Sequence, residues 1–248
     1  MPTARPVGEA TRSLSNVELL YLDGGNPLAV LQYEPRRSRN IGIVAGHGYS
    51  SSKHNIDFLC GFLSAHGFRV YSLDFPGHKL GASGGELGGV DDCIGAMQRV
   101  VALARERAND PVYTLGHSMG GMTAIFTAAL DETIAGVVAI ATGYGRPTSI
   151  ETLQKVGVTD FRASYVVGVT LPELVAGVGE RYDALLPRLA GRQQLYVAAS
   201  RDAMVSPRSV QELYDRAPDP KTFVTIESDH TYAAENSRAT VLQWFNER

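Results

Sequence analysis

Gly116-His117-Ser118-Met119-Gly120-Gly121 is the most informative stretch of this 248-residue sequence. It follows the apolar run Val112–Leu115, which predicts a strand, and it opens the apolar stretch Met119–Leu130, which predicts a helix. A serine flanked by glycines at a strand-to-helix junction is typical of a nucleophile elbow, a tight turn that presents the hydroxyl at the helix N-terminus. The pattern therefore predicts that Ser118 is a nucleophile; the alternative is a serine that only caps the helix.

Apolar strands alternate with helical stretches on both sides of this turn. The expected strands are 17–22, 28–33, 41–45, 69–74, 112–115, 134–141, 194–199 and 222–226, and the expected helices are 55–66, 90–108, 119–130, 207–216 and 231–246. The first two strands flank Asp23-Gly24-Gly25-Asn26-Pro27, which predicts an antiparallel hairpin. Strict alternation elsewhere predicts an α/β fold with a mostly parallel sheet covered by helices on both faces.

The alternation breaks between residues 143 and 192, where two short helices (149–156 and 171–189) are expected and no clear strand. Because structureless loops of this length are uncommon, we expect 143–192 to form a lid on a core made of 1–142 and 193–248. Apolar residues in 165–171 and 174–178 either line a substrate pocket or pack the lid onto the core.

Composition excludes several classes of function. The chain is 44% hydrophobic and 20% charged with a net charge of −3, which argues against a nucleic-acid or anionic-membrane partner. Cys60 and Cys93 stand too far apart for a zinc motif and are expected to be buried thiols. No metal or organic cofactor is expected. Without an apolar signal sequence or a run long enough to span a membrane, a cytoplasmic location is expected.

A serine nucleophile needs a histidine base, and the sequence has six histidines. His230 lies between the last expected strand and the last expected helix, at the carboxyl end of the sheet, where ligands gather in such folds. His47 and His117 stand beside turns and are expected to point at backbone neighbours. We therefore expect His230 to be the base.

The base in turn needs a carboxylate to orient it. Asp202 follows the strand 194–199 directly, at the same edge of the sheet. Asp229 is adjacent to His230, and neighbouring side chains diverge, while Asp74 precedes a turn and is expected to act there. Asp202 is therefore the expected acid.

An oxyanion hole should come from the main-chain N–H of Met119 and from one N–H of the loop after strand 41–45. In that loop Tyr49 is the expected second donor, with Ser50 as the alternative. Tyr144, His47 and Ser50 are also expected to contact the substrate.

Together these residues resemble the α/β-hydrolase superfamily. The resemblance is carried by His47-Gly48, the turn Asp74–His78, the elbow Gly116–Gly120, and Asp202 and His230, in the chain order Ser, Asp, His. It implies an eight-stranded, mostly parallel sheet with a lid inserted after the sixth strand. The stretch Lys79–Gly85 departs from the shorter run that relatives often carry after this turn, which puts the shape of the loop in question.

The expected activity is cleavage of a carboxylic ester or thioester of a small, largely apolar substrate through an acyl-enzyme. Two alternatives stay open. The same residues would serve acyl transfer, cyclisation or elimination in a biosynthetic pathway, and the fold also hosts non-catalytic receptors.

Overall fold

The computed structural model describes residues 16–107, 109–145 and 164–247. The strands are β1 (Asn16–Leu22), β2 (Leu28–Glu34), β3 (Gly42–Gly46), β4 (Arg69–Leu73), β5 (Val112–His117), β6 (Gly136–Ile140), β7 (Gln193–Ala199) and β8 (Lys221–Ile226). The helices are η3 (Lys53–Ile56), α1 (Asp57–Ala65), α2 (Val90–Glu106), α3 (Met119–Leu130), α6 (Leu171–Leu174), α7 (Val178–Leu185), η4 (Leu186–Leu189), α8 (Pro207–Arg216), α9 (Ala233–Asn236) and α10 (Arg238–Asn246).

The strands form an eight-stranded sheet in the order β1-β2-β4-β3-β5-β6-β7-β8. β1 pairs antiparallel with β2, and β2 pairs antiparallel with β4. The remaining neighbouring pairs are parallel. The predicted α/β fold with a mostly parallel eight-stranded sheet is confirmed. Because β3 to β8 run in one direction, the loops that follow them meet at one edge of the sheet.

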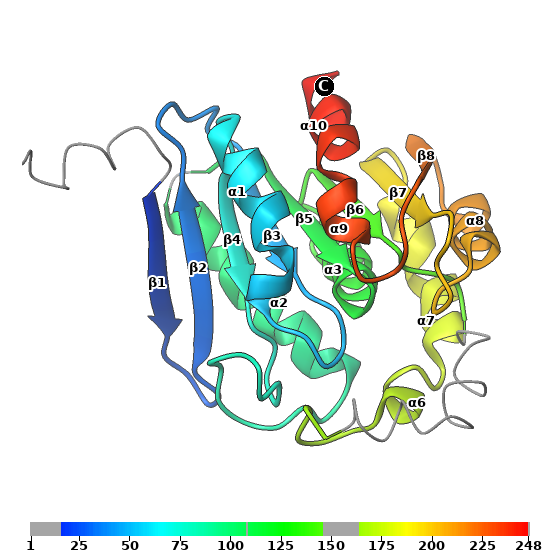
Figure 1. Cartoon of the computed structure of the whole chain (residues 1–248), viewed down its shortest axis with the longest axis horizontal. Helices are drawn as coiled ribbons and strands as arrows, with labels where there is room; N and C mark the ends of the chain where they lie inside the picture. Colours follow the sequence, from blue (N-terminus) through cyan, green and yellow to red (C-terminus); the bar gives the residue numbers. More distant parts are fainter. Residues whose placement is uncertain (1–15, 108, 146–163, 248) are drawn as a thin grey trace, which may run out of the picture.

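Helices cover both faces of the sheet (Figure 1). Helices α1, α9 and α10 pack on one face, and α2, α3, α7 and α8 pack on the other. Alternate residues of the central strands are buried on opposite faces of the sheet. Val44 packs on the face that α2 and α3 cover, whereas Ile43 and Ala45 pack on the face that α1 covers. Cys60 and Cys93 are both buried free thiols, as expected. Burial on both faces explains why the strands read as continuous apolar runs.

Two expected helices are interrupted. The stretch 171–189 divides into α6, α7 and η4, with Gly177 at φ 72° between the first two. The stretch 231–246 divides into α9 and α10 at Ser237, whose hydroxyl donates to the carbonyl oxygen of Ala234. The short helix expected at 149–156 lies outside the described residues.

The insertion between β6 and β7 joins the core through main-chain hydrogen bonds. Val167 N donates to Gly77 O, and Leu87 N donates to Val167 O, each at 2.8 Å. The side chains of Leu174 and Val178 are buried in the core. For these two residues the structure favours packing onto the core over lining a pocket.

Candidate active site

Ser118 occupies the sharp turn between β5 and α3, with φ 55° and ψ −118°. Such a positive φ is rare for a residue with a side chain and costs about 1–3 kcal/mol, so surrounding contacts must hold it. Ser118 N donates to Ile140 O at 2.8 Å, and Thr142 Oγ1 donates to Ser118 O at 2.6 Å. Both the N–H and the carbonyl oxygen of Ser118 are therefore hydrogen-bonded to the end of β6 or to the residues just after it.

Glycines let the backbones around Ser118 approach closely. A Cβ on Gly116 would lie 2.0 Å from the carbonyl carbon of Gly120, and a Cβ on Gly120 would lie 2.1 Å from Gly46 O. A side chain at either position would therefore displace main chain. The close packing brings β5, α3 and the loop after β3 into contact around the serine.

Asp202 and His230 lie side by side on loops that follow β7 and β8. Asp202 Oδ2 is 2.7 Å from His230 Nδ1, and Oδ1 accepts hydrogen bonds from the main-chain N–H groups of Met204 and Val205 at 2.8 and 2.7 Å. The Asp202 side chain is fully buried, whereas that of His230 is 11% exposed. A carboxylate only accepts hydrogen bonds, so the proton of a neutral His230 sits on Nδ1 and Nε2 keeps its lone pair.

His117 connects the serine turn to the histidine loop. Its Nε2 lies 2.8 Å from the carbonyl oxygen of His230, and the two ring centroids are 4.8 Å apart. Because a carbonyl only accepts, His117 Nε2 carries the proton. Burial, together with the neighbouring His230, lowers the pKa of His117 to about 3, so this ring is neutral at physiological pH.

The loop after β3 packs against the serine turn at Gly48. A Cβ on Gly48 would lie 3.4 Å from Ser118 Cβ. Tyr49 follows, with its hydroxyl donating to Val169 O at 3.1 Å, and Ser50 has φ 55° and is 4% exposed. Met119 is the first residue of α3, so its N–H has no acceptor within the helix. The loop and the start of α3 thus lie on neighbouring sides of Ser118.

His47 is fully buried, and both ring nitrogens are engaged by main chain. Nε2 accepts from Phe75 N at 3.0 Å, and Nδ1 donates to Gly48 O at 2.8 Å. Burial lowers the pKa of His47 to about 3, with His78 acting in the same direction. The expectation that His47 and His117 bond backbone neighbours is confirmed. The His47 ring has no exposed surface, and the expected contact of His47 with substrate stays a prediction.

The sequence between residues 43 and 245 matches the family model described as "Alpha/beta hydrolase family". That match spans most of the chain. The chain belongs to the alpha/beta hydrolase family. The sequence has no significant match among curated proteins.

Solved structures share this fold over nearly the whole chain. Est1E from Butyrivibrio proteoclasticus with bound ferulic acid superposes with a TM-score of 0.72 at 17% identity, covering 92% of this chain and 98% of Est1E. The Pyrococcus furiosus esterase PF2001 gives 0.72 at 16% identity, covering 99% and 96%. The thioesterase domain from the curacin biosynthetic pathway gives 0.67 at 14% identity, covering 93% and 99%. At these identities the likeness shows a common fold.

This alpha/beta hydrolase also contains a buried ion pair that the sequence analysis missed. Lys53 Nζ lies 2.5 Å from Asp74 Oδ2, with the side chains 3% and 0% exposed. Asp74 also accepts from the N–H groups of Lys53 and Ala82, each at 2.8 Å. Burial alone would raise the pKa of Asp74, but the hydrogen bonds, that from the Lys53 side chain first, hold it below its usual value. The pair ties the chain after the β3 loop to the turn after β4, and its partners are too far apart in sequence for a local motif to reveal.

Tyr144 follows β6, and its hydroxyl group contacts α7. It donates to Asp183 Oδ2 at 2.8 Å, and the guanidinium of Arg216 lies 3.9 Å from the ring centroid. The structure thus gives Tyr144 a packing role between α7 and α8, and its expected contact with substrate stays a prediction.

Within 16–107, 109–145 and 164–247, no group of three or more His, Cys, Asp or Glu residues is arranged to hold a metal ion. None of the helices in those ranges is long and apolar enough to cross a membrane.

Proposed function

We propose that the protein is a serine hydrolase that cleaves a carboxylic ester or thioester of a small, largely apolar substrate. The observation that carries the proposal is the 2.7 Å contact between His230 Nδ1 and Asp202 Oδ2. The His230 loop is joined to the turn at Ser118 by the hydrogen bond from His117 to the carbonyl oxygen of His230. Membership of the alpha/beta hydrolase family supports hydrolase activity in general. The order Ser, Asp, His along the chain agrees with this family's arrangement.

In the proposed first step, Ser118 Oγ attacks the carbonyl carbon of the substrate while its proton passes to His230 Nε2. Asp202 keeps the ring in the tautomer that leaves Nε2 free, and it stabilises the imidazolium. The carbonyl oxygen becomes an oxyanion, for which the N–H groups of Met119 and Tyr49 are the proposed donors, with Ser50 the alternative. One such donor contributes about 3 kcal/mol to transition-state stabilisation.

Collapse of the tetrahedral intermediate breaks the bond to the leaving group, which takes the proton from His230 and departs as an alcohol or a thiol. A water molecule then attacks the acyl group on Ser118 while giving a proton to His230. The second intermediate collapses, His230 returns that proton to Ser118 Oγ, and the carboxylic acid is released. Every proton is accounted for by His230.

Apolar side chains of the insertion, beside the loop after β3, support an apolar acyl group. Val169 and Leu171 of the insertion are half-buried and pack on the same core as Tyr49. We propose that these side chains, rather than the buried Leu174 and Val178, contact the acyl group.

The test is a panel of p-nitrophenyl esters from acetyl to decanoyl, with matching acyl thioesters, offered to the wild type and to Ser118→Ala. We expect the wild type to hydrolyse at least one series and the variant to lose about 10⁴-fold or more in kcat. Equal rates in the two proteins would overturn the proposal.

A further inference from the structure

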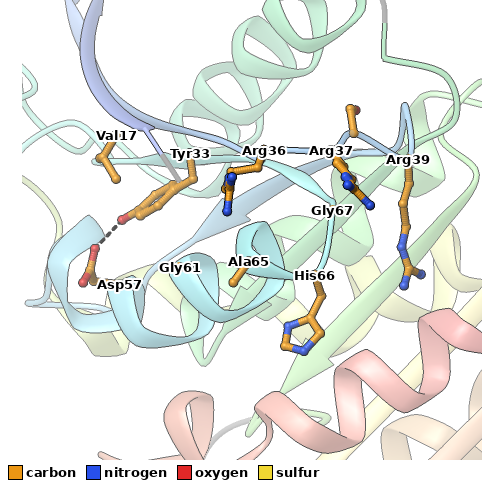
Figure 2. A pocket seen from close by; sticks show the side chains of 11 residues that line it. Val17, Tyr33, Arg36, Arg37, Arg39, Asp57, Gly61, Ala65, His66 and Gly67 are labelled. Carbon is orange, nitrogen blue, oxygen red and sulfur yellow. Dashed lines mark hydrogen bonds between the residues drawn. The ribbon is translucent and has the colours of Figure 1, made fainter. Parts of the chain in front are cut away.

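A groove of about 870 Å³ runs between the β1–β2 hairpin and α1 (Figure 2). We call it the basic groove. Val17 and Tyr33 line it from the strands, Gly61 and Ala65 line it from α1, and a loop with three arginines borders it. This loop precedes β3, so it lies at the amino ends of the parallel strands, whereas Ser118 follows the carboxyl end of β5. The groove is therefore separate from the candidate active site.

Three arginines and a histidine line the groove near the C-terminal end of α1. Arg36, Arg37, Arg39 and His66 line it, and Figure 2 shows the three arginine side chains extending from their loop toward the side where α1 lies. Arg39 is engaged by neutral groups, the amide oxygen of Asn246 at 2.8 Å and the ring of Phe68. In the part of the chain that the structure describes, neither Arg37 nor Arg39 forms an ion pair. Two of the three arginines therefore have no carboxylate partner among these residues, in a chain whose net charge is −3.

One acidic side chain lines the groove, and it is already bound. Asp57 Oδ1 accepts the hydroxyl proton of Tyr33 at 2.6 Å, at the N-terminal end of α1. His66 lies at the opposite end of that helix, with Nδ1 donating to Phe62 O at 2.8 Å. The acidic and basic ends of the groove are therefore separated by the length of α1.

The arginine loop is fixed to the core before any ligand arrives. Arg39 N donates to Gly67 O at 2.8 Å, and Asn40 N donates to Ser38 Oγ at 2.9 Å. Gly67 has φ 100°, a conformation that favours glycine, and a Cβ there would make a tight contact of 3.0 Å with Arg37 O. A preformed loop reduces the ordering cost of binding an anion.

Exposed apolar side chains lie on β1 and α1, two of the elements that form the groove. Val17, Leu19 and Tyr21 share one side of β1 and are 53%, 47% and 58% exposed, and Phe58 in the first turn of α1 is 68% exposed. A Cβ on Gly61 would meet nothing within 4 Å, so the helix wall of the groove is open. Apolar surface beside a cluster of arginines is suited to bind a ligand that has both an apolar part and an anionic group.

We propose that the basic groove binds an anionic amphiphile, with a carboxylate or phosphate head at Arg36 and Arg37 and an apolar body along Val17, Gly61 and Ala65. Guanidinium groups pair with the planar oxygens of carboxylate and phosphate in a bidentate geometry that ammonium groups lack. The inference does not depend on the proposed hydrolase activity. Two sources supply such a head group, a free acid and a membrane lipid.

The test uses calorimetric titration of the full chain with decanoate below its micelle concentration, with acetate and octyl glucoside as head-only and chain-only ligands. We expect one site for decanoate and none detectable for the other two. Gly61→Leu places a side chain in the groove at a position where a Cβ meets nothing within 4 Å. Arg36→Gln/Arg37→Gln removes two of the cations, and each change should weaken binding at least tenfold. Gly95→Leu on α2, where a Cβ also meets nothing within 4 Å, is the matched control and should bind like the wild type.

Sedimentation with phosphatidylglycerol vesicles distinguishes the two sources. Vesicle binding that is lost in the same variants, with no decanoate binding, assigns the groove to a lipid head group and supports the proposal. Decanoate affinity that is unchanged in Gly61→Leu would place the ligand elsewhere, at the active site for example, and would overturn it. Absence of both kinds of binding in the wild type would also overturn it.

Discussion

The His117 ring donates a hydrogen bond of 2.8 Å to the main-chain carbonyl oxygen of His230. His117 immediately precedes Ser118, so this bond links the candidate nucleophile to the candidate base without using either functional side chain. We expect it to hold the His230 loop at the distance that proton transfer requires.

Replacing His117 with Ala removes this link. A hydrogen bond of this kind contributes about 1 kcal/mol, so we expect kcat on a p-nitrophenyl ester to fall about five- to tenfold with little change in KM. His117→Gln, which retains a donor, should recover part of the loss. If KM rises and kcat is unchanged in His117→Ala, the residue contacts substrate instead of positioning the loop.

Asp202→Asn tests the choice of acid. The amide can donate to Nδ1 and so favours the tautomer in which Nε2 carries the proton, which removes the base. We expect kcat to fall by about 10⁴, as for the same change in other serine enzymes. Asp229→Asn is the matched control: Asp229 is adjacent to His230 but accepts from Tyr232 N at 3.0 Å. Similar losses in both variants would contradict the assignment.

Gly120→Ala tests the close packing beneath the nucleophile. Its methyl group would lie 2.1 Å from Gly46 O, so main chain must move and we expect a loss of about 3 kcal/mol or more in the free energy of unfolding. Gly95→Ala is also a helical glycine but meets nothing within 4 Å, and it should gain about 0.5–1 kcal/mol. Urea unfolding of the two variants measures both values; a stable Gly120→Ala protein would show that the packing is looser.

Acid should destabilise the protein through two histidines whose pKa values are lowered in the folded state. The pKa values of His47 and His117 are each lowered to about 3 from an ordinary value of 6.5. Between these values the unfolded chain binds more protons than the folded one, so stability is full above pH 6.5 and is lost as the pH falls toward 3. Each histidine adds a slope approaching 1.4 kcal/mol per pH unit.

Urea unfolding at pH 7, 6 and 5 measures this slope before most carboxylates titrate. His117→Gln should show a shallower dependence than the wild type, because one titrating group is gone. A free energy of unfolding that is constant from pH 7 to pH 5 would mean that neither ring is held neutral.

Sequence reasoning succeeded where local signals govern the structure. Met119–Leu130 and Pro207–Arg216 have the predicted helix bounds, because a glycine-rich turn precedes one and Ser206 with Pro207 starts the other. The loop positions of Asp202 and His230 followed from the strand pattern, since parallel strands bring their carboxyl ends to one edge.

Features that depend on contacts between residues far apart in the sequence could not be predicted from local sequence patterns. The order of the strands, the Lys53–Asp74 pair and the burial of His47 arise from partners far away in the sequence. Glycine commonly ends a helix, and Gly177 marks the break that the expected helix 171–189 did not include.

The most direct measurement is the mass of the protein after treatment with a fluorophosphonate, with the adduct located by peptide mapping. We predict one adduct, on Ser118, that forms at least a hundredfold more slowly in His230→Ala and does not form in Ser118→Ala. An unmodified wild-type protein, or an adduct that forms equally fast without His230, would contradict the account.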